Sequence, residues 1–216
     1  MAAQKSLLAS LNFTTPLGPM RAVAGAAGLS SLVFSGGDYD TPPLQTNPFS
    51  GSRADAAALC TLPEIGERRC ALHDYGDDAI AAHIDFGTEQ APANAEEAAK
   101  VRACLVSCFR ELAEYFAGRL RGFTVALDLK GGDFRRRAWG ALCDIPYGAT
   151  VSYARQAAAV GNAKAARAVG AANRANPVAI IVPCHRVIAS DGSLCGYAGG
   201  LWRKRYLIAL ERAASR

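Results

Sequence analysis

Apolar residues in the first 35 positions come in short runs that turn residues separate. In "SLNFTTPLGPMRAVAGAAGLSSLVFSGG" the runs break at residues 16–19 and again at residues 25–28. Proline and glycine at such breaks favour turns, and short runs between turns favour strands. The pattern therefore predicts three strands in a small antiparallel meander.

The pattern changes beyond residue 36. Residues 36–76 are rich in Gly, Pro, Asp and Ser, with "GGDYDTPPLQTNPFSG" at their start. This composition predicts an irregular loop, to which we assign no function. The apolar residues of "AIAAHIDF", residues 79–86, indicate a further strand.

Helical spacing begins near residue 94. Asn94 is placed to cap a helix, Glu96 and Glu97 lie in its first turn, and Gly118 marks its end. The apolar residues repeat at intervals of three and four: Val101, Leu105, Phe109, Leu112 and Phe116. A helix over these residues is predicted, followed by a strand in "FTVALDL", residues 123–129.

The second half of the chain predicts short helices. "DFRRRAWGALCDI" places Phe134, Ala138, Trp139 and Leu142 on one face. Two Ala-rich segments, "SYARQAAAVG" and "NAKAARAVGAANRANP", follow with a turn at residues 161–163. Their lengths are typical of a helix-turn-helix, although a plain pair of antiparallel helices fits them too. Small residues around its cations would let the second helix approach DNA closely.

Charge is unevenly distributed along the chain, whose net charge is +5. Residues 1–118 hold 8 basic and 14 acidic side chains, whereas residues 119–216 hold 16 basic and 5 acidic ones. A basic half favours contact with a polyanion such as DNA, although solvated surface charge explains the same numbers. Because the balance changes there, we place a domain boundary at residues 119–132.

Bulk composition excludes several classes of protein. The 216 residues are 50% hydrophobic and 20% charged, as in ordinary globular proteins, and no apolar run approaches the ~20 residues of a membrane span. The N-terminal residues are a poor match to a secretory signal, because Ser10 and Asn12 interrupt their apolar part. We therefore expect a cytoplasmic protein without membrane contact. The seven cysteines are odd in number and lack CxxC spacing, which argues against a disulfide framework or a structural zinc site.

One segment combines apolar and reactive residues. In "NPVAIIVPCHRVIASDG" an apolar run, interpreted as a buried strand, reaches Pro183 and is followed by Cys184, His185 and Arg186. A cysteine beside a histidine can be a nucleophile with its base, a packed structural pair or part of a metal site. Neighbours on a strand point to opposite faces, so His185 would need a bend, a water or a carboxylate to serve the thiol. The residues alone leave these alternatives open.

The same segment resembles a known family. "PCHRVI", preceded by "ANRANPVAIIV" and followed by "GSLCGYAGG", is similar to the active-site signature of the O6-alkylguanine-DNA alkyltransferases. The similarity continues through "IPYGATVSYARQAAAVGNAKAARAVGAANRANP" to "LIALE", and so covers residues 133–211. The opening "TTPLGPMRAVAGAAGLSSLVF" resembles the N-terminal domain of that family less specifically.

The resemblance implies an α/β fold in two domains. Residues 1–118 would form a small ribonuclease-H-like α+β domain, and residues 119–132 a linker with a boundary strand. Residues 133–216 would form a helical DNA-binding and alkyl-acceptor domain with a helix-turn-helix. The implied activity is stoichiometric transfer of the alkyl group of O6-alkylguanine, and also of O4-alkylthymine, from double-stranded DNA to a cysteine.

The resemblance also assigns roles to single residues. Cys184 would accept the alkyl group, His185 would act as base through a water, and Glu211 would orient the imidazole. Asn176 would brace the active-site turn, and Tyr153 would help rotate the target phosphate and protonate the departing guanine. The residues implied in DNA contact are Arg167, Tyr153, Ser152, Lys164, Arg174 and Arg186. The implied pocket residues are Tyr197, Val187, Gly199 and Ala198, the last of which replaces a serine common in the family.

The implied partner is double-stranded DNA that contains O6-alkylguanine. We expect a monomer that acts without metal, organic cofactor or obligate protein partner. Two other functions remain compatible with the residues: a DNA-binding protein that performs no transfer, and a Cys–His hydrolase.

Overall fold

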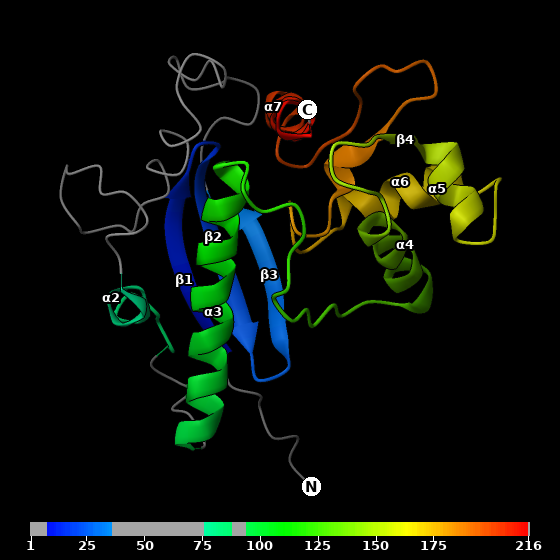
Figure 1. The fold of residues 1–216 in the computed structure, drawn as a ribbon. Helices are drawn as coiled ribbons and strands as arrows, with labels where there is room; N and C mark the ends of the chain where they lie inside the picture. Colours follow the sequence, from blue (N-terminus) through cyan, green and yellow to red (C-terminus); the bar gives the residue numbers. More distant parts are fainter. Residues whose placement is uncertain (1–7, 36–75, 88–93, 216) are drawn as a thin grey trace, which may run out of the picture. The chain divides into compact units, whose positions relative to one another are not determined.

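The computed structural model describes residues 8–35, 76–87 and 94–215, which form two compact units. Residues 8–35, 76–87 and 94–129 belong to the first unit, and residues 130–215 to the second (Figure 1). Residues 36–75 of the predicted irregular loop lie outside the described residues. Strands and helices both contribute, so the predicted mixed α/β class is confirmed.

A three-stranded sheet forms one layer of the first unit. Strands β1 (Leu8–Thr15), β2 (Gly18–Gly25) and β3 (Gly28–Phe34) pair antiparallel in the order β1-β2-β3, which confirms the predicted meander. Alternate residues of the strands are buried because successive side chains point to opposite faces of a sheet. Those of β1 and β2 are Ala9, Leu11, Phe13, Met20, Ala22 and Ala24.

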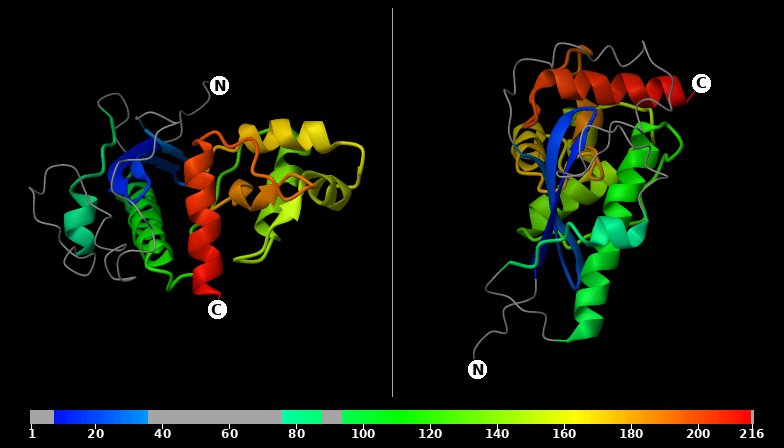
Figure 2. Two further views of the ribbon diagram at one scale, coloured as in Figure 1. Left: turned by 90° about the horizontal axis from the view of Figure 1, so that it is seen from above. Right: turned by 90° about the vertical axis from the view of Figure 1, so that its left-hand side faces the viewer.

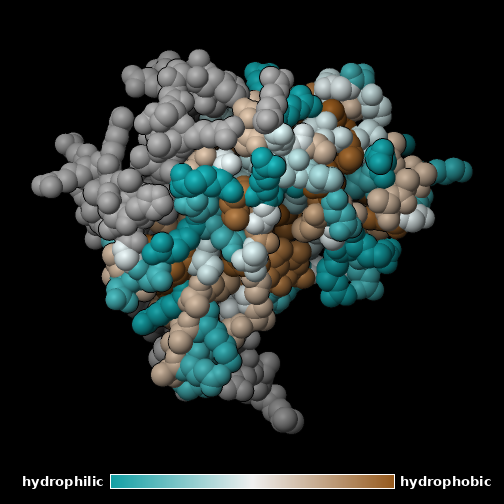
Figure 3. Space-filling model, in the orientation of Figure 1, coloured by the Kyte–Doolittle hydropathy of each residue, from teal (hydrophilic) through white to brown (hydrophobic). Residues whose placement is uncertain are grey.

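Helix α3 (Ala95–Phe116) packs along one face of this sheet (Figures 1 and 2). As predicted, Asn94 caps it: its Oδ1 accepts a hydrogen bond of 2.7 Å from the Glu97 amide, and Gly118 follows with a φ of 72°. Phe109 of α3 meets Phe13 edge to face, with ring centroids 5.4 Å apart. The outward side of α3 carries polar residues together with alanines (Figure 3). No helix among the described residues is long and apolar enough to cross a bilayer.

The strand predicted for residues 79–86 is wrong. Helix α2 (Asp77–Ala81) occupies the start of that segment, and only Asp85 pairs with β1, through two hydrogen bonds of 2.8 and 2.9 Å to Ser10. Asp77 and Asp78 lie in the first helical turn, where carboxylates are stabilised by the exposed amides. This local preference outweighs the short apolar run.

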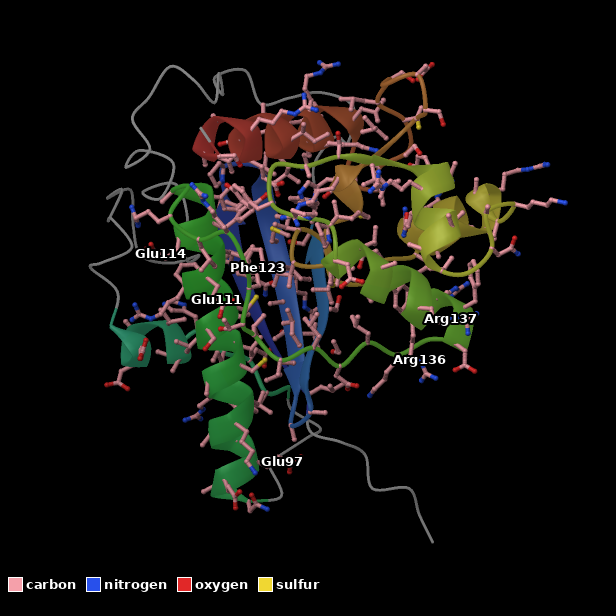
Figure 4. The ribbon with its side chains drawn as sticks, turned by 45° about the vertical axis from the view of Figure 1, so that its right-hand side comes forward. Glu97, Glu111, Glu114, Phe123, Arg136 and Arg137 are labelled. Atoms are coloured by element: carbon pink, nitrogen blue, oxygen red, sulfur yellow. The ribbon has the colours of Figure 1, made fainter. Side chains whose placement is uncertain are left out.

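The strand predicted for residues 123–129 is reduced to a single parallel bridge between Leu29 and Leu127. A Cβ at Gly28, where φ is 135°, would lie 2.5 Å from the Ala126 carbonyl oxygen, so only glycine permits this close approach. Glu111 of α3 accepts hydrogen bonds from the amides of Thr124, at 2.8 Å, and Val125, at 3.3 Å. Figure 4 shows Glu111 on α3 and Phe123 in the adjoining segment. A side chain thus satisfies amides that a strand ladder would otherwise bind.

The second unit is built from short helices. It contains α4 (Asp133–Cys143), α5 (Tyr153–Ala159), α6 (Ala166–Arg174), the 3₁₀ helix η2 (Cys184–Arg186) and α7 (Leu201–Ala214). The helices predicted at α4, α5 and α6 are confirmed. Trp139 of α4 donates to the Ala172 carbonyl of α6 at 2.8 Å, and Gln156 of α5 donates to the Ala138 carbonyl of α4 at 3.0 Å. These two bonds join the three helices.

A two-stranded parallel pairing positions the candidate site. Strand β4 (Val151–Ser152) pairs with β5 (Val187–Ile188), with Val151 opposite Val187. The start of α5 follows β4 directly, and η2 precedes β5 directly. The first residue of α5, Tyr153, is therefore brought beside the segment that carries Cys184.

Candidate active site

The backbone before Cys184 turns instead of extending. The buried strand predicted for the apolar run that ends at Pro183 is wrong: the Val182 amide donates to the Val178 carbonyl at 3.1 Å, and Ile180 has a φ of 72°. The run is still buried, with Val178, Ile180 and Val182 at 0% exposure. Its apolar side chains fill a helical unit, so burial here carries no information about extended structure. Cys184 and His185 then lie on the turn of η2, and the bend required by the sequence argument is present.

Asn176 holds this turn together. Its Nδ2 donates to the Val182 carbonyl at 2.7 Å and to Cys184 Sγ at 3.3 Å, and its Oδ1 accepts from the Val178 amide at 3.0 Å. One side chain thereby fixes both ends of the turn and contacts the thiol. Backbone groups that would pair in a strand are satisfied by the amide instead.

Cys184 is buried, with 9% of its surface exposed. Burial raises the pKa of the Cys184 thiol, while the hydrogen bond from Asn176 and the charge of Lys204 act in the opposite direction. The resting thiol is therefore protonated near neutral pH, and a nucleophilic role requires a base.

His185 and Glu211 form a buried pair. His185 Nε2 lies 2.8 Å from Glu211 Oε1, and the two side chains are 0% and 1% exposed. Burial lowers the pKa of His185, against the opposing hydrogen bond and charge of Glu211. Burial alone would raise the pKa of Glu211, but the hydrogen bonds and charges of His185 and Arg186 outweigh it and lower that pKa to about 2. Neutral His185 therefore donates Nε2–H to an ionised carboxylate. Its Nδ1 is buried and has no hydrogen-bond partner among the described residues.

Arg186 does not lie where DNA contact requires it. Its side chain is buried, Nε and Nη2 each donate to Glu211 at 3.0 Å, and Nη1 donates to the Ile145 carbonyl at 2.6 Å. The guanidinium is therefore turned inward, and the expectation that Arg186 binds DNA is wrong. A motif of consecutive residues gives no information about which side chains of a 3₁₀ turn face the interior.

Lys204 is a site residue that the sequence reasoning missed. It is 0% exposed, and its Nζ donates to the carbonyls of Val187, at 2.6 Å, and Cys195, at 2.7 Å. Burial lowers the pKa of Lys204, whereas electrostatic interactions with Cys195 and Cys184 act in the opposite direction. Lys204 and Glu211 are seven residues apart on α7, which places them on one face of the helix. This spacing from Glu211 was the feature of the sequence that could have identified Lys204 as a site residue.

Tyr153 and a pocket lie next to this cluster. The Tyr153 hydroxyl donates to the Cys195 carbonyl at 3.3 Å, and burial, followed by the electrostatic interaction with Cys195, raises the pKa of Tyr153 to about 12. A pocket of about 680 Å³ is lined by Tyr153, Gly170, Ala171, Arg174, Cys195, Gly196, Tyr197 and Ala198. Tyr197 and Ala198 were predicted at this wall. Val187 and Gly199 are buried and contribute carbonyls, which accept from Lys204 at 2.6 Å and from Arg203 at 2.6 Å.

The remaining candidate DNA contacts lie on or beside the α5–α6 pair. Lys164, Arg167 and Arg174 are exposed, and Arg174 also lines the pocket. Ser152 instead caps α5, since its hydroxyl accepts from the Arg155 amide at 3.2 Å. Exposed arginines also occur on α4, where Figure 4 shows Arg136 and Arg137.

Acid is expected to destabilise the second unit through His185 and Glu211. Both folded pKa values lie below the ordinary ones of 6.5 and 4.5, so the unfolded chain binds more protons as the pH falls. Stability present near neutral pH is then lost below pH 6.5, and further between pH 4.5 and about 2. Urea titrations across this pH range measure the free energy of unfolding. The variant Glu211→Gln should lack the second loss, and a midpoint that does not change with pH would contradict the assignment.

The chain is similar to proteins of known name. The family described as "6-O-methylguanine DNA methyltransferase, DNA binding domain" matches residues 133–213. A methylated-DNA–protein-cysteine methyltransferase of Mycolicibacterium paratuberculosis is 57% identical over 105 residues, which are 49% of this chain and 64% of the relative. One from Methanosarcina barkeri is 53% identical over 102 residues, 47% of this chain and 65% of the relative. The matched segments thus span slightly less than two thirds of these curated relatives.

Solved structures match over nearly the whole chain. Mycobacterium tuberculosis OGT in complex with DNA is 34% identical, with a TM-score of 0.62, over 95% of this chain and 93% of that one. The structure of Mycobacterium tuberculosis O6-methylguanine methyltransferase is 33% identical, with a TM-score of 0.62, over 97% and 96% of the two chains. The similarity therefore includes the N-terminal unit, which the match at residues 133–213 does not reach.

Proposed function

The chain belongs to the O6-methylguanine-DNA methyltransferase family, and from that premise we propose that it repairs O6-alkylguanine in duplex DNA by moving the alkyl group onto Cys184. One observation carries the proposal: the Cys184 thiol, held by Asn176, lies next in sequence to a buried His185–Glu211 pair. O4-alkylthymine would be a second substrate. The reaction consumes the thiol and needs alkylated DNA alone.

The first step is activation of the thiol. Because Nε2–H of His185 faces the ionised Glu211, Nδ1 is the nitrogen that can accept a proton. A water bound at Nδ1 would carry the proton from Cys184 to the imidazole. Asn176 keeps Sγ in place during this transfer through its 3.3 Å contact.

The second step is an in-line displacement. The thiolate attacks the alkyl carbon, the new C–S bond forms as the C–O6 bond breaks, and the electron pair leaves with the guanine. Tyr153, which keeps its proton to about pH 12, would donate it to the departing base. The thioether formed is stable to water, so each molecule would react once.

The lesion must leave the base stack to reach Cys184, at a cost of a few kcal/mol. We propose that α5 and α6 act as a helix-turn-helix in the minor groove and that Arg167 of α6 fills the space of the extruded nucleotide. Ser152, Lys164 and Arg174 would contact the backbone, and Tyr153 would help turn the target phosphate. Tyr197, Ala198, Val187 and Gly199 would surround the flipped base. The ribonuclease-H-like relationship of the first unit belongs to the same proposal.

A labelled duplex tests the proposed reaction. Incubation with DNA that carries radiolabelled O6-methylguanine is expected to place one equivalent of label on the peptide containing Cys184. Binding without transferred label would instead favour a DNA-binding protein. Sustained turnover of an ester or peptide would favour the Cys–His hydrolase.

Arg167→Ala is expected to slow transfer from O6-methylguanine in duplex DNA by about tenfold, because flipping would lose its intercalated side chain, worth a few kcal/mol at most. Reaction with free O6-benzylguanine, which requires no flipping, should be nearly unchanged. Single-turnover rates on both substrates measure the difference. The matched variant Arg167→Lys keeps the charge and separates filling of the gap from attraction to phosphate. Equal losses on both substrates would contradict the role.

A further inference from the structure

The guanidinium of Arg186 is an internal part of the site. Nε reaches both Glu211 oxygens, at 3.0 and 3.3 Å, and Nη2 reaches Oε1 at 3.0 Å. Nη1 donates to the Ile145 carbonyl at 2.6 Å, and the Tyr147 ring lies 5.7 Å from the guanidinium carbon. With 6% exposure, this cation is oriented entirely by protein groups.

Glu211 is shared by three partners: His185, Arg186 and the Gly148 amide. Its Oε1 accepts from both His185 Nε2 and Arg186, and its Oε2 accepts from the Gly148 amide at 3.0 Å as well as from Arg186. A buried carboxylate beside a single imidazole would favour the imidazolium, because the opposite charge stabilises it. Beside a permanently charged guanidinium, the same carboxylate is already neutralised.

We propose that Arg186 is a positioning residue that neutralises Glu211 and thereby keeps His185 uncharged, so that Nδ1 can accept the proton of Cys184. The inference rests on the proposed transfer to Cys184 and adds what sets the pH range of that reaction. It also gives a chemical reason for the third residue of "CHR". The lowered pKa of His185 agrees with this role, because the charge of Arg186 lowers it together with burial and the charge of Lys204.

Other charged and titratable groups complete the surroundings. His185 is faced by Glu211 and Lys204 of α7 and by its neighbours Cys184 and Arg186. Cys143 at the end of α4 interacts with Asp144 and with Arg186, and the Tyr147 ring faces Arg186. Tyr153 and Tyr197 face the thiol. Within this set Arg186 is the cation that contacts the carboxylate, so its removal changes the charge balance at Glu211 most directly.

The test compares three variants by their pH–rate profiles for single-turnover transfer from duplex O6-methylguanine. Arg186→Met removes the charge and keeps an unbranched apolar stem, Arg186→Lys keeps the charge, and the double variant Arg186→Met/Glu211→Gln removes both charges. With Met alone, the acid limb is expected to move up by at least about one pH unit, which gives an about tenfold loss of rate on that limb and recovery at higher pH. The lysine variant should stay close to the wild type, and the double variant should return the limb toward it. An equal loss at every pH would overturn the proposal.

The ¹⁵N signals of the His185 ring give a readout independent of transfer. The folded wild-type protein should show a neutral ring protonated at Nε2 from about pH 5.5 to 8. In the methionine variant the change to imidazolium should occur at least about one pH unit higher than in the wild type, which is the shift expected for the acid limb of the rate. Wild-type imidazolium near pH 6.5, or a ring in the folded methionine variant that titrates no higher than in the wild type, would overturn the proposal. If the methionine variant does not fold, the wild-type ring decides. Failure of wild-type transfer to Cys184 would instead refute the proposed function and leave these spectra valid.

Discussion

Cys184→Ala is expected to abolish alkyl transfer while DNA containing the lesion still binds. The thiol is the only group proposed to form a bond to the alkyl carbon, and no other nucleophile takes part in the proposed reaction. Affinity should stay within about threefold, because phosphate and groove contacts from α5 and α6 would supply the binding energy and remain intact. Label transfer and a fluorescence titration with the same duplex measure the two properties.

Cys143→Ala is the matched control for that experiment. Cys143 lies in the same unit but is exposed on α4, so its removal should leave both transfer and binding unchanged. Residual label on the Cys184→Ala protein would identify a different acceptor, and loss of both properties would mean that Cys184 is mainly structural. Loss of both properties would follow from a structural role, because Cys184 is buried and its Sγ contacts Asn176.

The elements with strong local signals were predictable from the sequence. The cap at Asn94, the apolar repeat of α3 and the turn residues around β2 each act through neighbours within a few positions. Local chemistry decides such elements, and the structure confirms them. The helices α4, α5 and α6 follow the same logic.

The apolar run before Pro183 shows where local reasoning fails. Its β-branched residues favour a strand, but the hydrogen bonds of the segment go to the side chain of Asn176 and within the turn itself. Residues 123–129 fail similarly, since Glu111 binds two of their amides from another element. Side-chain acceptors that are distant in sequence leave no periodic trace.

The candidate site likewise contains residues that were predicted correctly and residues that were not. Cys184, His185, Glu211 and Asn176, assigned through the family resemblance, do gather in one cluster. Arg186 was assigned to a surface that contacts DNA, but its guanidinium points into the protein interior. Adjacency in "CHR" gives no information about that inward orientation. Lys204 was missed because a lysine on a helix is ordinarily solvated. Its burial follows from the packing of α7 against η2 and β5, where its Nζ binds the Val187 carbonyl.

Tyr153→Phe is expected to slow transfer from duplex O6-methylguanine by about 100-fold, the usual scale for loss of a general acid. Guanine leaves as a basic anion unless it is protonated, and the Tyr153 hydroxyl keeps its proton because burial and the interaction with Cys195 raise its pKa to about 12. The same hydroxyl donates to the Cys195 carbonyl at 3.3 Å, a bond that Lys204 also makes at 2.7 Å. The pocket wall should therefore survive the loss of one donor.

A substrate with a better leaving group separates acid catalysis from pocket structure. S⁶-methyl-6-thioguanine in the same duplex leaves as a weaker base, so its transfer depends less on a proton donor. The phenylalanine variant should lose much less activity on that lesion than on O6-methylguanine, with equal affinity for both duplexes. An equal loss on the two lesions would assign Tyr153 to positioning of the phosphate and remove it from the proton transfer. Because the ring is kept in Tyr153→Phe, a selective loss on the oxygen compound can arise from the hydroxyl alone.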